Sequence, residues 1–113
     1  MTSKTFTERN WRKDPAFWDL CRALASCKTT DAVADLLRDI GTLGELHAWS
    51  ERLQVAKLLA SEKTYREVAQ ITGASTTTVT RVARFLQDGT GGYRRFLEQN
   101  KNPSTTSKTR ETT

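Results

Sequence analysis

One stretch of this chain, TYREVAQITGASTTTVTRVARFL over residues 64–86, constrains the fold more than any other. It contains two short helical patterns joined by a turn with a glycine. The spacing fits two helices that cross closely, with a small residue at their contact, glycine in the turn and branched apolar residues on the inner face. These structural roles fall on Val68, Ala69, Gly73, Val79 and Val82. The intervals between them agree with the helix-turn-helix that reads DNA.

The second of these helices is rich in threonine, although threonine is a mediocre helix former. In a helix-turn-helix the N-terminal part of the second helix enters the major groove, where short hydroxyls and arginines can bond phosphates and base edges. The predicted DNA-binding residues are Ser75, Thr76, Thr77, Thr78, Thr80, Arg81 and Arg84, with Lys63 and Arg66 as flanking phosphate contacts. The alternative is that these side chains form an ordinary solvated helix surface.

Charge and length are compatible with this hypothesis. The formal net charge of +5 and the pI near 9.6 suit a polyanionic partner such as nucleic acid. A chain of 113 residues suits one domain with a limited core, which gains from a partner. Because no apolar run resembles a signal peptide or membrane span, we expect a cytoplasmic, bacterial-type protein that is nucleoid-associated when bound.

The rest of the sequence is predicted to be helical, because no sustained period-2 alternation marks a strand. The expected organisation is a flexible polar arm over 1–13, a helical domain over 14–99 and a disordered tail over 100–113. The expected helices cover residues 15–26, 31–40, 43–61, 65–71, 76–87 and 93–99.

Helix starts are indicated by capping residues. Three single N-caps are expected at Asp14, Thr30 and Ser75, and two capping boxes are expected at Thr42 with Glu45 and at Thr64 with Glu67. Gly41 is expected to close the second helix. In the last helix, Arg94 and Arg95 either contact phosphates or merely solubilise the helix.

No catalytic or metal site is predicted. Cys21 and Cys27 are not at metal or redox spacing, and His47 has no ligand partner at a suitable interval. No nucleophile–base pair or paired carboxylate site is visible, so we do not expect an enzyme. Trp11, Trp18 and Trp49 are expected in core or dimer-interface packing.

The segments QVAKLL, TYREVAQ followed by TGAS, TVTRV and GGY resemble the tryptophan-repressor superfamily, and within it the TrpR-like YerC/YecD family. The resemblance covers roughly residues 15–98. It implies an all-α, six-helix fold and an intertwined homodimer, whose N-terminal helices and third helix build a shared core. It also implies two recognition helices that face successive major grooves.

The resemblance does not extend cleanly to the tryptophan site of that family. Arg81 matches a ligand-holding arginine on the recognition helix, but Val82 stands where the family has a glycine that leaves room for the indole. The second ligand-holding arginine matches Arg52 only after a one-residue slip, since the ungapped match is Glu51. Arg52 and Arg81 are therefore the possible ligand-binding pair, and we expect no cofactor and no L-tryptophan corepressor.

The sequence thus predicts a sequence-specific, double-stranded DNA-binding transcriptional regulator that represses as a homodimer. Two alternatives remain open at this point. One is a protein-interaction adaptor that uses the helix-turn-helix as a docking surface, and the other is a tryptophan-dependent repressor. The expected partners are double-stranded DNA and a second copy of the chain, with no membrane and an unknown small-molecule effector.

Overall fold

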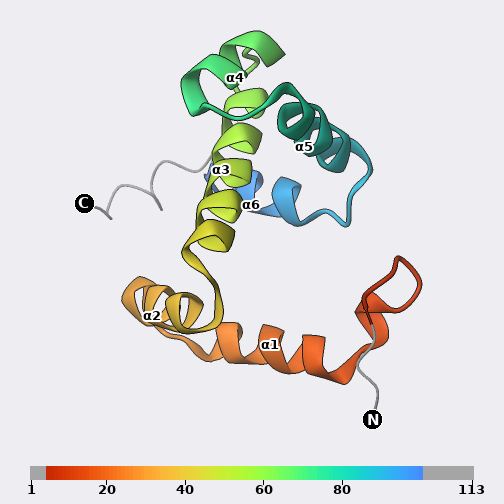
Figure 1. Ribbon diagram of the computed structural model, residues 1–113, viewed down its shortest axis with the longest axis vertical. Coiled ribbons are helices and arrows are strands. Elements are labelled where there is room, and N and C mark those ends of the chain that lie inside the picture. The colour runs from red at the N-terminus through yellow and green to blue at the C-terminus, as the bar shows by residue number, and fades with distance from the viewer. Residues whose placement is uncertain (1–4, 101–113) are drawn as a thin grey trace. The chain divides into compact units, whose positions relative to one another are not determined.

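The computed structural model describes residues 5–100, and every regular element in that range is a helix (Figure 1). A short 3-10 helix, η1 (Trp11–Lys13), precedes the α-helices. These are α1 (Pro15–Ser26), α2 (Thr30–Ile40), α3 (Leu43–Ala60), α4 (Tyr65–Thr72), α5 (Thr76–Asp88) and α6 (Gly92–Asn100). The predicted all-α, six-helix fold is confirmed. The first four residues and the predicted tail from residue 101 onward lie outside the described residues.

The contacts within the chain divide it into two compact units, with the boundary between Leu46 and His47. We call residues 5–46 the N-terminal unit and residues 47–100 the C-terminal unit. The N-terminal unit holds η1, α1, α2 and the first turn of α3. The C-terminal unit holds the remainder of α3 with α4, α5 and α6.

Helix starts in the N-terminal unit follow local capping chemistry, with one correction. The Asp14 carboxylate accepts hydrogen bonds from the backbone N–H groups of Ala16 and Phe17, at 2.8 and 3.3 Å. The expectation that Thr30 caps α2 is wrong, because Thr30 is already helical. The cap is Thr29, whose extended backbone places its hydroxyl to accept from the Ala32 N–H at 3.0 Å.

Aromatic contacts organise the start of the N-terminal unit. The Phe17 ring meets the rings of Phe6, Trp11 and Trp18 edge-to-face, with centroids 6.1, 5.4 and 5.9 Å away. The Arg12 guanidinium lies over both tryptophan rings. Through these contacts the described part of the predicted arm lies against α1. No side chain in the described part of this unit is fully buried.

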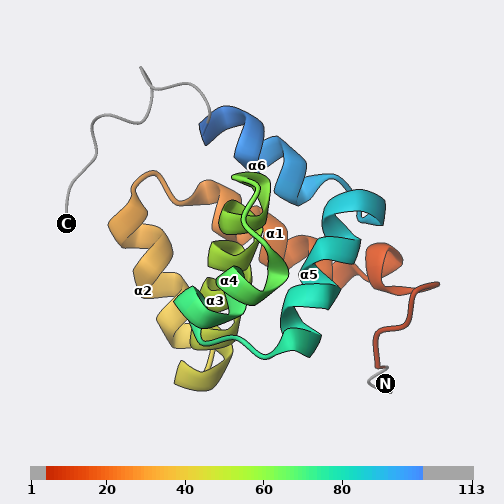
Figure 2. The same cartoon turned by 90° about the horizontal axis from the view of Figure 1, so that it is seen from above.

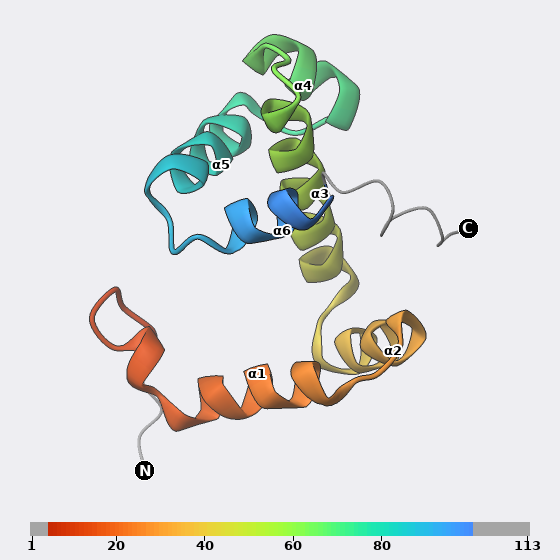
Figure 3. The same ribbon diagram turned by 180° about the vertical axis from the view of Figure 1, so that it is seen from behind.

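The core lies in the C-terminal unit, where α3, α4 and α5 meet. The buried residues there are Val55, Ala56, Val68, Ala74, Val79 and Val82. Tyr93 of α6 packs against this cluster, in line with the position of α6 beside the middle of α3 in Figures 1 and 3. Valine is stiff at χ1, so a valine-rich core fixes how these short helices pack.

The end of α3 is unusual because a glutamate occupies a left-handed position. The backbone N–H groups of Glu62 and Lys63 donate to the carbonyls of Leu59 and Leu58, the two reverse bonds of a Schellman motif. Such a motif needs positive φ after the helix, and Glu62 has φ +68° where glycine is usual. The helix therefore ends at Ala60, one residue before the predicted end.

Candidate nucleic-acid interface

The capping box at the start of α4 is present as predicted. The Thr64 hydroxyl accepts from the Glu67 N–H at 3.1 Å, and the Glu67 carboxylate accepts from the Thr64 N–H at 2.9 Å. The pKa of Glu67 is lowered, first by that backbone hydrogen bond and further by the Thr64 hydroxyl and the nearby Lys63, while desolvation opposes the shift. A second capping box, formed by Thr42 and Glu45, opens α3.

The turn between α4 and α5, visible from above in Figure 2, depends on Gly73 and on a threonine that the sequence analysis missed. Gly73 has φ +79°, and a Cβ there would meet no atom within 4 Å, so glycine is needed for its backbone and not for space. The Thr72 hydroxyl donates to the Val68 carbonyl at 2.8 Å and accepts from the Ala74 N–H at 3.0 Å. Thr72 thus ties the end of α4 to the turn.

Helix α5 divides into a buried and an exposed side. Val79 and Val82 are at most 1% exposed, and they belong to the core. Ser75 caps the helix by accepting from the Thr78 N–H at 3.1 Å, and the two hydroxyls are themselves 3.1 Å apart. The exposed predicted DNA-binding residues are Lys63, Arg66, Ser75, Thr76, Thr77, Thr80, Arg81 and Arg84, while Thr78 is half-buried.

Phe85 is a second residue that the sequence analysis missed. Its ring lies under two guanidinium groups, with the Cζ atoms of Arg81 and Arg84 at 5.0 and 5.9 Å from the ring centroid. The spacing of Arg81 and Phe85, four residues apart on a helix, was the available signal.

Arg94 has a role that neither alternative in the sequence analysis included. Its Nε donates to the Leu86 carbonyl at 2.9 Å, and a terminal nitrogen donates to the Gln87 carbonyl at 2.7 Å. These carbonyls belong to the last turn of α5, where carbonyl groups have no N–H donor within the helix. Arg94 therefore caps the C-terminal end of α5 and joins α6 to it. Arg95 is exposed.

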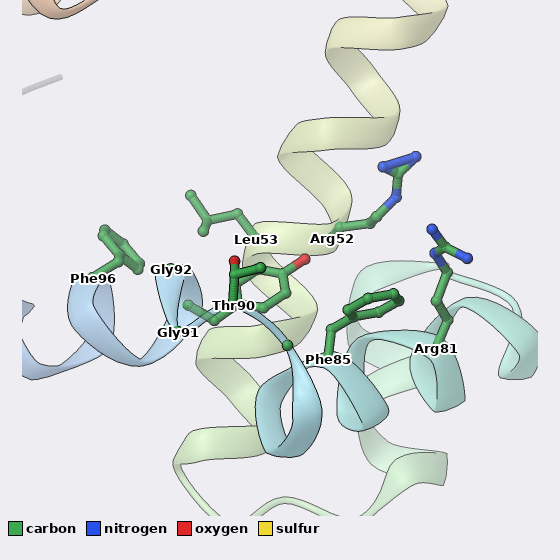
Figure 4. A pocket seen from close by; sticks show the side chains of 10 residues that line it. Arg52, Leu53, Arg81, Phe85, Thr90, Gly91, Gly92 and Phe96 are labelled. Carbon is green, nitrogen blue, oxygen red and sulfur yellow. The ribbon is translucent and has the colours of Figure 1, made fainter. Parts of the chain in front are cut away.

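A pocket of about 450 Å³ lies between α3, α5, α6 and the loop of residues 89–91 that joins the last two helices (Figure 4). Arg52 of α3 and Arg81 of α5 lie on the same side of it, and Phe85, Tyr93 and Phe96 supply its aromatic lining. Burial raises the pKa of the Tyr93 phenol, and the positive charges of the two arginines oppose the shift.

The structure brings the predicted ligand-binding pair, Arg52 and Arg81, together and places Glu51 and Val82 elsewhere. Arg52 lines the same pocket as Arg81, whereas Glu51 lines a different pocket of about 300 Å³ beside His47. Val82 lies in the valine core, and it is not among the residues that line the arginine pocket.

Other polar and sulfur side chains form simple local arrangements. Both cysteines, Cys21 and Cys27, are free thiols and half-buried. His47 lies 3.8 Å from the Glu51 carboxylate on the surface of α3. Within residues 5–100, no three histidine, cysteine or acidic side chains gather as metal ligands, and no helix is long and apolar enough to cross a membrane.

These features define an all-α protein in which two short helices, joined by a glycine turn, present a hydroxyl-rich and basic helix surface. The model of the family described as Trp repressor protein matches residues 16–101, and the chain belongs to this family. It is 33% identical over 88 residues to the uncharacterized protein YerC of Bacillus subtilis (strain 168). The aligned region covers 78% of this chain and 85% of YerC.

Two solved structures share the fold. A TrpR-like protein from Eubacterium eligens ATCC 27750 superimposes with a TM-score of 0.76 at 39% identity, over 80% of this chain and 93% of the other. A candidate Trp repressor from Staphylococcus aureus superimposes with a TM-score of 0.78 at 30% identity, over 85% of this chain and 96% of the other. The predicted family membership is confirmed.

Proposed function

We propose that this protein is a sequence-specific, double-stranded DNA-binding transcriptional regulator that represses as a homodimer. The observation that carries the proposal is the two-sided character of α5. Its valines anchor the helix in the core, while Thr76, Thr77, Thr80, Arg81 and Arg84 remain exposed on a helix that begins directly after the Gly73 turn. Membership of the Trp repressor family supports the same function.

In this proposal α4 and α5 act as a helix-turn-helix. The N-terminal part of α5 enters the major groove, where its hydroxyls and arginines contact base edges and phosphates. Lys63 and Arg66 add phosphate contacts from the start of α4. Bound at its operator in the cytoplasm, the protein blocks polymerase and performs no catalysis.

The homodimer is supported by incomplete burial in the N-terminal unit. Helices α1 and α2 contain no buried residue, and the large apolar side chains Ile40 and Leu43 are 49% and 65% exposed. Exposed apolar surface of this kind is typical of protein interfaces. In this dimer the two α5 helices bind half-sites about 34–36 Å apart on a nearly palindromic operator.

For the effector, we propose that specific DNA binding needs no L-tryptophan. The family resemblance covers the tryptophan site only in part, because Val82 replaces the family's glycine and Arg52 matches the second ligand-holding arginine only after a one-residue slip. Val82 itself lies in the valine core, outside the pocket of Arg52 and Arg81. If a different small molecule tunes binding, the pocket with Arg52 and Arg81 is the candidate site, because two guanidinium groups there suit an anionic group.

The test is selection of bound fragments from a random duplex library by the purified full-length protein, at about 150 mM salt and with or without L-tryptophan. We expect a near-palindromic sequence to be enriched in both arms. Enrichment only with L-tryptophan would instead establish the tryptophan-dependent repressor. No enrichment by a folded dimer would reject the DNA-binding function and favour the adaptor.

Variants locate the surface on the selected duplex. We expect Arg81→Ala and Arg84→Ala each to weaken specific binding by roughly 1–3 kcal/mol without unfolding the protein. The matched control is Arg95→Ala, which removes one exposed positive charge from α6 and leaves α5 unchanged. Equal losses in all three variants would mean that general charge, and not α5, governs binding.

A further inference from the structure

Phe85 is a large aromatic side chain of α5 that does not belong to the valine core. It is 37% exposed, whereas Val79 and Val82 on the buried side of the helix are at most 1% exposed. Exposing an apolar ring to water is unfavourable, so its position calls for a contact that compensates. The ring makes cation–π contacts with two arginines of its own helix (Figure 4 shows Arg81 beside it), and it also lines the pocket of Arg52 and Arg81.

The geometry of this group is that of a double cation–π contact. The Arg81 and Arg84 Cζ atoms lie 5.0 and 5.9 Å from the centroid of the Phe85 ring, both within the range of about 6 Å for such contacts. Among the described residues, neither guanidinium forms an ion pair or a hydrogen bond with a protein group. The ring therefore restrains both arginines while their N–H donors stay available.

Such restraint matters for a planar cation. A guanidinium carries its five N–H donors in one plane. When the face of the guanidinium contacts an aromatic ring, the N–H groups at its edge remain available to guanine or phosphate. A side chain that is already ordered loses less conformational entropy when it binds.

We propose that Phe85 is a positioning residue for DNA recognition, whose ring holds the Arg81 and Arg84 guanidinium groups in the orientation that binds DNA. This inference rests on the proposed DNA-binding function and deepens it. Because the ring acts through the arginines, the effect of removing it must disappear when both arginines are absent.

The experiment measures binding to the duplex selected by the wild-type protein and to an unselected duplex. Phe85→Leu keeps an apolar side chain but removes the ring, whereas Phe85→Tyr keeps the ring. Phe96→Leu is the matched control, because Phe96 lines the same pocket without a cation–π contact. The same Phe85→Leu change is also made in a protein that carries Arg81→Ala and Arg84→Ala.

We expect Phe85→Leu to weaken binding to the selected duplex by about tenfold, from two exposed cation–π contacts, and to change binding to the unselected duplex much less. Phe85→Tyr should restore affinity to within about twofold, and Phe96→Leu should have little effect. In the protein without the two arginines, Phe85→Leu should cause no further loss.

A second readout needs no DNA. Side-chain Nε relaxation of the free protein should show Arg81 and Arg84 becoming more mobile in Phe85→Leu but not in Phe96→Leu. Unchanged mobility, or wild-type affinity in Phe85→Leu, would overturn the inference. So would an undiminished effect without the arginines, which would show direct contact of the ring with DNA or a packing role.

The two proposals fail in different ways. If the wild-type protein selects no duplex, the DNA-binding function fails and the positioning role fails with it. If the wild-type protein selects a duplex but Phe85→Leu and Phe96→Leu are equivalent, only the positioning role fails.

Discussion

The helices of the N-terminal and C-terminal units have similar N-terminal caps but differ in how many apolar side chains they bury. Hydroxyl or carboxylate caps begin α1 and α2 in one unit and α4 and α5 in the other. Every buried apolar side chain among residues 5–100 nevertheless lies in the C-terminal unit. Capping and helix propensity thus determine where a helix forms. They do not bury its apolar face, which requires a second surface that packs against it.

Because the two units differ in burial, they also differ in the interactions that stabilise them. The C-terminal unit excludes water from a valine cluster shared by three helices. The described part of the N-terminal unit relies on caps and edge-to-face aromatic pairs, each worth about 0.5–1.5 kcal/mol beyond area burial. A second copy of the chain, as proposed above, would supply the missing burial for α1 and α2.

The largest expected effect tests this contrast directly. Val79→Ala removes two methyl groups from the buried cluster and leaves a cavity, so we expect the free energy of unfolding to fall by about 2–3 kcal/mol. Denaturant unfolding followed by circular dichroism measures it. The exposed neighbour change Thr80→Ala should stay within about 0.5 kcal/mol.

The same comparison needs a variant in the N-terminal unit. Leu36→Ala shortens a half-buried side chain of α2 and should weaken self-association, which sedimentation over a range of concentrations would detect. Unaltered self-association in Leu36→Ala would show that α2 takes no part in the dimer.

The next prediction concerns the junction between α5 and α6. A Cβ at Gly89 would overlap the carbonyl oxygen of Phe85, which accepts the Gly89 N–H that closes α5. Because that obstacle is backbone, we expect Gly89→Ala to cost about 1–3 kcal/mol and to disturb the end of α5. Gly92→Ala is the control, since a Cβ there meets nothing within 4 Å. Equal melting temperatures for the two variants would contradict the overlap.

Much of the fold could be predicted because its signals are local. The spacing of Val68, Gly73, Val79 and Val82 predicts two helices and a turn, and Thr64 with Glu67 indicates where the first begins. Such patterns depend on residues within a few positions of each other, so one sequence suffices. The start of α2 was misplaced because Thr29 and Thr30 are equally good caps, and only the backbone conformation distinguishes them.

The candidate site was less predictable, since its missed residues act across elements. Arg94 reaches carbonyls seven and eight residues earlier, which requires a turn geometry that its neighbours do not specify. Phe85 has the spacing of a core position, yet its ring contacts arginines. The pairing of Arg52 with Arg81 in one pocket likewise depends on how α3 and α5 pack.

Capping boxes allow a direct comparison of the two units. Thr42→Ala and Thr64→Ala each remove a hydroxyl that accepts a backbone N–H, one at the start of α3 and one at the start of α4. We expect each to cost about 1 kcal/mol in thermal unfolding. Serine at either position should restore most of the loss, because it keeps the accepting hydroxyl. A neutral Thr64→Ala would mean that the box contributes nothing to α4.

Glu62 offers a stabilising change in the C-terminal unit. Its left-handed backbone is unfavourable for a residue with a Cβ, so we expect Glu62→Gly to raise the free energy of unfolding by about 0.5–1 kcal/mol. Glu62→Ala also removes the negative charge from the C-terminal end of α3 but keeps a Cβ. If alanine stabilises as much as glycine, charge and not backbone conformation is the cause.

The smallest expected effect is a pH dependence confined to the start of α4. Hydrogen bonding to the Thr64 backbone lowers the pKa of Glu67 below its ordinary value of 4.5, so the folded protein binds a proton there less readily than the unfolded chain. The associated stability is therefore present above pH 4.5 and is lost as the pH falls through the lower, folded-state pKa. Glu67→Gln retains an acceptor for the Thr64 N–H but does not titrate, so its unfolding free energy should fall less steeply on acidification. Parallel pH profiles for the wild-type protein and Glu67→Gln would assign the acid sensitivity to other carboxylates.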